Sequence, residues 1–127
     1  MNLSNIEGIK VRLIEPKFIH TQYCDNYVLN AVHLENMRIL YTEILEGQDD
    51  LSDIKLMVEF EGSIEISHDI SERYLADRIR PKKGEALVSN NPRTLEFLKG
   101  ASALMGQSHP VKVFTTVEEA KIWLESI

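Results

Sequence analysis

The chain has few of the residues that stabilise a protein covalently or open special chemistry. Of its 127 residues only Cys24 is a cysteine, so no internal disulfide can form. Its 6 glycines are spread singly and form no glycine-rich phosphate loop. No apolar run reaches about 18 residues, so the sequence predicts no membrane-spanning helix. Charges fall where a signal peptide needs an apolar stretch, and we therefore expect a cytoplasmic protein.

The side chains that usually carry catalysis are scattered along the sequence. The histidines are His20, His33, His68 and His109, with no pair at helical spacing and no cysteine cluster. No Gly-x-Ser-x-Gly motif provides an activated serine. The carboxylate pairs Asp49–Asp50 and Glu118–Glu119 fall in an expected loop and an expected capping turn. The sequence therefore predicts no catalytic residue, no metal site and no cofactor.

The net charge of −6 disfavours nucleic acid as a partner, because nucleic-acid binders present a basic face. One basic run exists, RIRPKKG, with Arg78, Arg80, Lys82 and Lys83. Cations suit the C-terminus of a helix, and Pro81 would end that helix. Contact with an anionic partner or a lipid headgroup is the alternative for this run.

Hydrophobic periodicity predicts five strands. They are expected at residues 9–14, 17–24, 54–60, 85–89 and 111–114, the first two forming a hairpin. Helical spacing follows in four places: from residues 30–34 to Gly47, at 69–79, at 92–105 and at 116–127. The order β-β-α-β-α-β-α-β-α predicts a single α/β domain over residues 1–127. We expect a mixed five-stranded sheet, mostly parallel, with an N-terminal hairpin and covering helices.

The two C-terminal helices have apolar stripes and capping signals. The stripes consist of Phe97, Leu98, Ala101, Leu104 and Met105 in one and Val117, Ala120, Trp123 and Leu124 in the other. We expect Gly100, inside the first of these helices, to allow a close approach to the sheet. Thr116 with Glu119 is typical of a capping box, and Asp69 with Glu72 resembles one.

The stretch SNNPRT, residues 89–94, joins an expected strand to an expected helix. Asn90 or Asn91 can cap that helix, and Pro92 suits its first position, so capping alone explains these residues. Arg93 is different, because a cation at a helix N-terminus is mildly unfavourable. Ligands of open α/β sheets bind beyond the carboxyl ends of the strands. The candidate binding residues there are Asn90, Asn91 and Arg93, with Ser67, His68 and Asp69, although acids also favour a helix N-terminus without any ligand.

Two C-terminal segments resemble a known family. ALVSNNPRTLEFLKGASAL is similar to the last-but-one strand and helix of the STAS-like superfamily, and PVKVFTTVEEAKIWL to its closing strand and helix. The nearest resemblance is to stand-alone SpoIIAA-like STAS domains of bacteria, which mostly have no assigned function. It covers the whole chain as topology and these segments as motif. It implies a regulatory domain related to anti-sigma-factor antagonists and to the cytoplasmic domains of sulfate transporters.

One feature departs from that superfamily. Its phosphoswitch members carry an Asp-Ser-Ser/Thr-Gly loop after the third strand, whereas this chain reads EFEGSIEISHDISERYL there. Ser63, Ser67 and Ser71 are nearby without that context. The sequence therefore predicts that phosphorylation is not the switch.

Three functions stay open. The first is a non-enzymatic regulatory or protein-interaction module, whose partner is a protein or a small anionic ligand. The second is a small-ligand carrier for a lipid or nucleotide. The third is an enzyme that uses His68, Asp69 and the loops beside them. Homodimer formation also stays open.

Overall fold

A computed structural model describes the backbone of most of the chain. The described residues are 3–6, 8–15, 17–30, 32, 35, 39, 43, 52–66, 82–105 and 109–127. The strands are β1 (Leu3–Ile6), β2 (Ile9–Glu15), β3 (Phe18–Tyr23), β4 (Tyr27–Leu29), β5 (Lys55–Phe60), β6 (Ile64–Ile66), β7 (Gly84–Ser89) and β8 (Val111–Phe114). The helices are α3 (Pro92–Met105) and α4 (Val117–Glu125).

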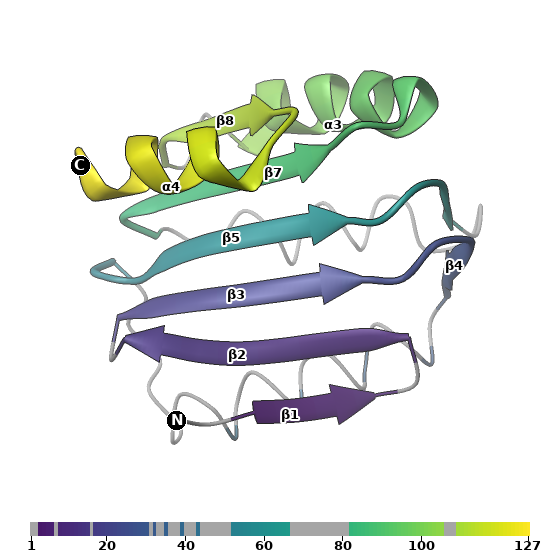
Figure 1. Cartoon of the computed structure of the whole chain (residues 1–127), viewed down its shortest axis with the longest axis horizontal. Coiled ribbons are helices and arrows are strands. Elements are labelled where there is room, and N and C mark those ends of the chain that lie inside the picture. The colour runs from purple at the N-terminus through teal and green to yellow at the C-terminus, as the bar shows by residue number, and fades with distance from the viewer. Residues whose placement is uncertain are drawn as a thin grey trace.

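The main sheet contains six strands in the order β1-β2-β3-β5-β7-β8 (Figure 1). The pairs β1–β2 and β2–β3 are antiparallel, and the pairs β3–β5, β5–β7 and β7–β8 are parallel. The fold is therefore mixed α/β with a mixed sheet. The five expected strands are all present as neighbours, and the expected hairpin is β2–β3. β1 extends the sheet by one strand, and β4 pairs with β6 in a separate small sheet.

Short length explains why β1, β4 and β6 had no clear signal in the sequence. β1 reads LSNI and contains two polar residues, while β4 and β6 have 3 residues each. The β1–β2 turn contains Gly8 with φ +84°, a left-handed conformation that glycine adopts without steric cost. A Cβ at Gly8 would lie 2.8 Å from the Tyr27 ring, so the turn also packs closely against β4.

The two described helices cover opposite faces of the sheet. Leu98 and Ala101 of α3 pack on the face that contains Val58 and Leu87, which we call the α3 face. Ala120 and Leu124 of α4 pack on the opposite face, which contains Phe18, Met57, Ala86 and Val88 and is called the α4 face. All six residues of β7 are buried, as expected for a central strand covered on both sides.

The expected apolar stripes agree with the described side chains. Leu98, Ala101, Ala120 and Leu124 are buried, while Phe97, Val117 and Trp123 pack half-buried at the margins of the two cores. The side chains of Leu104 and Met105 lie outside the described residues. Thr116 caps α4 as predicted, because its Oγ1 accepts a hydrogen bond from the Glu119 backbone N–H at 3.3 Å.

The expectation for Gly100 was wrong. It is exposed, and a Cβ built there would have no neighbour within 4 Å. No close approach to the sheet therefore requires a glycine at this position.

The two remaining expected helices fall largely outside the described residues. Val32, Glu35, Ile39 and Glu43 have helical backbone and exposed side chains, in agreement with the first of them. Residues 67–81, with Asp69, Glu72, Arg78 and Arg80, lie wholly outside. Lys82 and Lys83 immediately precede β7, and the Lys83 N–H donates to the Ile54 carbonyl at 2.9 Å. Of the described helices, none is long and apolar enough to cross a membrane.

Candidate functional site

The carboxyl ends of the parallel strands meet at one edge of the sheet. β3, β5 and β7 run in the same direction, so the segments that follow them lie at that edge (Figure 1). These segments are residues 24–26, 61–63 and 90–91, and α3 begins directly after the last of them. We call this region the carboxyl edge. It is where the sequence analysis placed Asn90, Asn91 and Arg93.

Of the two asparagines that the sequence offered as a cap, Asn90 and Asn91, the structure shows Asn91 in that role. Its Oδ1 accepts from the backbone N–H groups of Arg93 at 3.0 Å and Thr94 at 3.1 Å, satisfying two free donors at the start of α3. Its own N–H donates to Ser89 Oγ at 3.1 Å. Asn90 is exposed and is not the cap. The capping interpretation is thus confirmed for Asn91 and for Pro92, which is the first residue of α3.

Arg93 places a positive charge at the protein surface where α3 begins. Its residue is exposed, and its guanidinium makes no ion pair with the described residues. The first turn of α3 contains no acidic residue that would offset the charge. The misfit noted in the sequence therefore persists in the structure.

Side chains fasten the segments of the carboxyl edge to one another. Asp25 Oδ1 accepts from the Ser63 N–H at 2.9 Å, and Ser63 Oγ donates to Asn26 Oδ1 at 2.8 Å. Thr94 Oγ1 of α3 donates to the Gly62 carbonyl at 3.0 Å. Gly62 has φ +78°, and a Cβ there would come within 2.2 Å of Asp25 Oδ1, so only glycine fits. The edge is therefore a fixed surface rather than a set of independent loops.

The other candidate residues are not placed. Ser67, His68 and Asp69 lie outside the described residues. The structure consequently brings Asn90, Asn91 and Arg93 together and leaves the second group as a sequence prediction.

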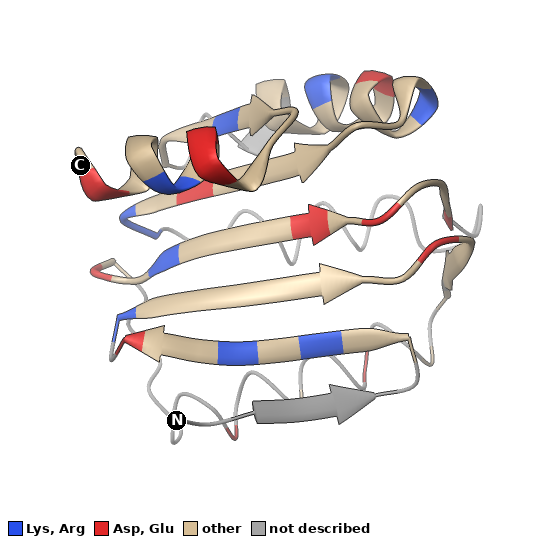
Figure 2. Cartoon of the chain, in the orientation of Figure 1, with Lys and Arg blue, Asp and Glu red and all other residues tan. Residues whose placement is uncertain are grey.

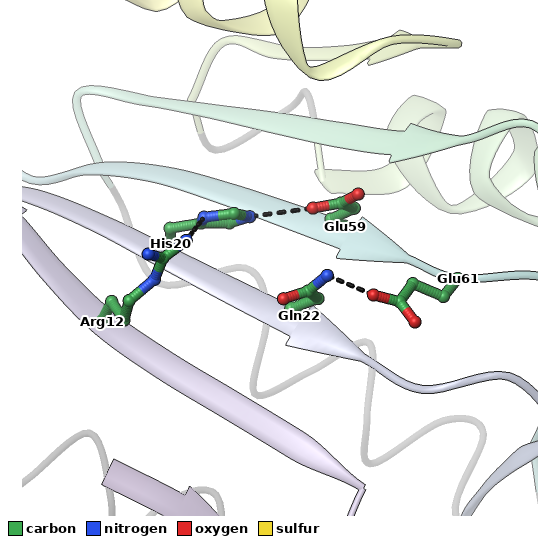
Figure 3. Close-up of polar contacts among 5 residues, drawn as sticks. All are labelled: Arg12, His20, Gln22, Glu59 and Glu61. Atoms are coloured by element: carbon green, nitrogen blue, oxygen red, sulfur yellow. Dashed lines mark hydrogen bonds and ion pairs between the residues drawn. The ribbon is translucent and has the colours of Figure 1, made fainter. Parts of the chain in front are cut away.

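A second polar cluster, absent from the sequence predictions, crosses three strands on the α4 face. Arg12 of β2, His20 of β3 and Glu59 of β5 follow one another there (Figure 3). Arg12 Nη2 lies 3.3 Å from His20 Nδ1, and His20 Nε2 lies 3.1 Å from Glu59 Oε1. We call these residues the Arg12–His20–Glu59 row. Beside it, Gln22 Nε2 donates to Glu61 Oε1.

The hydrogen bonds of the row determine the state of the imidazole. A guanidinium can only donate, so Nδ1 of His20 must accept and carries no proton. Nε2 then carries the proton and donates to Glu59, which makes His20 neutral. Burial lowers the pKa of His20 and favours the neutral imidazole. The hydrogen bond to Glu59 and the charge of Glu59 raise this pKa, whereas the charges of Arg12 and Lys121 lower it further.

A third polar cluster is buried on the α3 face. His109 Nε2 lies 3.0 Å from Glu85 Oε1, and their side chains are 1% and 0% exposed. Lys82 Nζ approaches the same oxygen at 3.5 Å, with a side chain 7% exposed. Glu85 was predicted only as the first residue of a buried strand, and His109 only as the residue before Pro110. Within the described residues, no group of three or more histidine, cysteine or acidic side chains is placed to hold a metal ion.

Comparisons with known proteins identify no relative. No protein-family model, no curated protein and no solved structure matches the chain.

Proposed function

We propose that this chain is a non-enzymatic, cytoplasmic regulatory or protein-interaction domain of the STAS-like type, with its partner surface at the carboxyl edge around Arg93. Arg93, which makes no ion pair with the described residues, supplies a cation for an acidic group of the partner. Asn90 and Asp25 are also exposed at the carboxyl edge and provide further polar groups.

One observation carries the proposal. The segments after β3 and β5 are tied to each other and to α3 by hydrogen bonds from Ser63 and Thr94. A surface that is already ordered loses little conformational entropy when it binds, which favours recognition. These hydrogen bonds hold the loops together, while the Arg93 guanidinium, which has no ion pair within the described part of the chain, can bind an external partner.

A charge-removal pair tests this surface. A protein is first captured from cells that make the chain, purified, and its affinity measured by calorimetry. Arg93→Ala should weaken binding by about tenfold or more, since arginines are frequent interface hot spots. Lys99→Ala removes a cation from an exposed position farther along α3 and should change the affinity less than about twofold.

Equal affinities for the wild type and both variants would exclude the carboxyl edge as the partner surface. Native mass spectrometry of the purified chain checks the carrier alternative. A stoichiometric bound lipid or nucleotide would contradict a module that acts only through proteins.

A further inference from the structure

Among the described residues, Arg12 makes no ion pair with a carboxylate. Its residue is exposed, and within the described residues its guanidinium contacts only His20 Nδ1. Guanidinium groups favour bidentate pairing with carboxylate or phosphate oxygens. Here one donor contacts a neutral imidazole, which fixes the orientation of the group without neutralising its charge.

His20 and Glu59 position the Arg12 side chain. Because Glu59 accepts the Nε2 proton, the lone pair of His20 is held on Nδ1, toward Arg12. The charged groups that act on the imidazole are Arg12 from β2, Glu59 from β5 and Lys121 from α4. Burial together with the two cations keeps His20 neutral at neutral pH, so this positioning is present under ordinary conditions.

Two lysines, Lys10 and Lys121, lie near the Arg12–His20–Glu59 row. Lys10 precedes Arg12 by two residues, so both lie on the same face of β2, and both are exposed. Figure 2 shows the basic positions of β2 in blue. Lys121 of α4 lies close enough to influence the charge of His20. Neither lysine makes an ion pair within the described part of the chain. The acids Glu59 and Glu61 are hydrogen-bonded to His20 and Gln22.

This accumulation contrasts with the acidic character of the whole chain, whose net charge is −6. We propose that the α4 face carries an oxyanion-binding site in which Arg12 and Lys10 bind a carboxylate or phosphate group and His20 and Glu59 are positioning residues. The site is separate from the carboxyl edge and does not depend on the function proposed there.

Anion titration followed by NMR tests the site directly. Sodium phosphate and sodium acetate are added in separate titrations of the full chain, against sodium chloride at matched ionic strength. Saturable shifts are expected at the Arg12 side chain and at the backbone of Lys10 and Gln22. The two titrations distinguish phosphate from carboxylate as the preferred oxyanion, and saturation by either supports the site.

Two charge-neutral variants locate the binding. Arg12→Gln should weaken it by about tenfold or more, because it removes a charge-assisted hydrogen bond. Lys99→Gln removes the same charge from an exposed position on α3 and should leave the affinity unchanged. The proposal is overturned if neither anion gives saturable shifts, or if Arg12→Gln binds as the wild type does.

The positioning role of His20 needs a measurement that would not change if His20 only stabilised the fold. Nitrogen-15 shifts of the imidazole should show the proton on Nε2 at neutral pH, and a proton on Nδ1 would overturn the positioning role. His20→Gln can still accept from Arg12 and donate to Glu59, so it should retain binding. His20→Leu should lose it, and equal affinities in these two variants would remove His20 from the site. If His20→Leu does not fold, the nitrogen-15 shifts and the affinity of His20→Gln still test the positioning role of His20.

Discussion

Two histidine–glutamate pairs with the same residue types have different surroundings in this protein. They are His20–Glu59 and His109–Glu85. The first lies on the α4 face, with side chains 7% and 24% exposed, and continues to the exposed Arg12. The second lies on the α3 face, with side chains 1% and 0% exposed, and includes Lys82. The distances between the paired atoms are nearly equal, at 3.1 Å and 3.0 Å.

What differs is the cost of losing one member. A carboxylate in the interior has exchanged its water for a few protein donors, so removing one donor leaves a charge with little compensation. At Glu59, whose side chain is 24% exposed, water can replace a lost partner at smaller cost. The buried pair should therefore govern stability, while the row on the α4 face is free to serve recognition.

The largest expected effect is at Glu85. Glu85→Ala leaves Lys82 and His109 in the core without their carboxylate and should lower the free energy of unfolding by about 3–5 kcal/mol. Urea unfolding measures the change. A loss below about 1 kcal/mol would show that the buried cluster contributes no more than a surface pair.

A pair of double-mutant cycles compares the two couplings themselves. The Glu85→Gln and His109→Gln cycle should give a coupling of about 1–3 kcal/mol, as expected for contacting groups in the core. The corresponding cycle at Glu59 and His20 should give less than about 1 kcal/mol. Equal couplings would mean that burial does not distinguish the pairs.

The pH dependence of stability should reveal the lowered pKa of His20. Its folded pKa lies below the ordinary value of 6.5, so the unfolded chain takes up the proton first as the pH falls. Neutral His20 therefore makes its full contribution to stability when the pH is above the ordinary pKa. This contribution decreases as the pH falls below the ordinary pKa, and the decrease ends once the pH is below the folded pKa. His20→Gln should lose less stability than the wild type between about pH 7 and about pH 5. Parallel curves for the two proteins would contradict the lowered pKa.

The smallest effect on stability is expected for Glu59→Gln. Glutamine can still accept from the His20 Nε2–H group, so the free energy of unfolding should change by less than about 1 kcal/mol. The substitution removes a charge that raises the pKa of His20, and the NMR titration midpoint of His20 should therefore move further down. An upward shift of the His20 titration midpoint would show that Glu59 does not raise the pKa of His20.

The sequence predicted local features better than contacts between distant segments. Alternation and apolar runs located the strands that form β2, β3, β5, β7 and β8, because each pattern is contained within its own strand. Thr116 and Asn91 were identifiable for the same reason, since a cap contacts only the next few residues.

The two histidine–glutamate pairs could not be predicted in this way. Glu59 and His20 become neighbours only through the parallel pairing of β3 with β5, and His109 reaches Glu85 only through that of β7 with β8. One signal was present: Glu59 lies within the largely apolar run IKLMVEF, and Glu85 begins the short strand EALVS that was predicted to be buried. A charged residue in a run predicted to be buried indicates that a partner elsewhere in the chain must compensate it.

The order of strands in the main sheet has a consequence for the synthesis of the chain. Read from one edge to the other, the strands follow their order in the sequence, so no later strand inserts between two earlier ones. During translation, the β1–β2–β3 hairpins can therefore form first, and each newly emerged strand can add to the existing edge. N-terminal fragments of increasing length should gain resistance to proteases one strand at a time, whereas resistance that appears only in the full chain would exclude such stepwise growth.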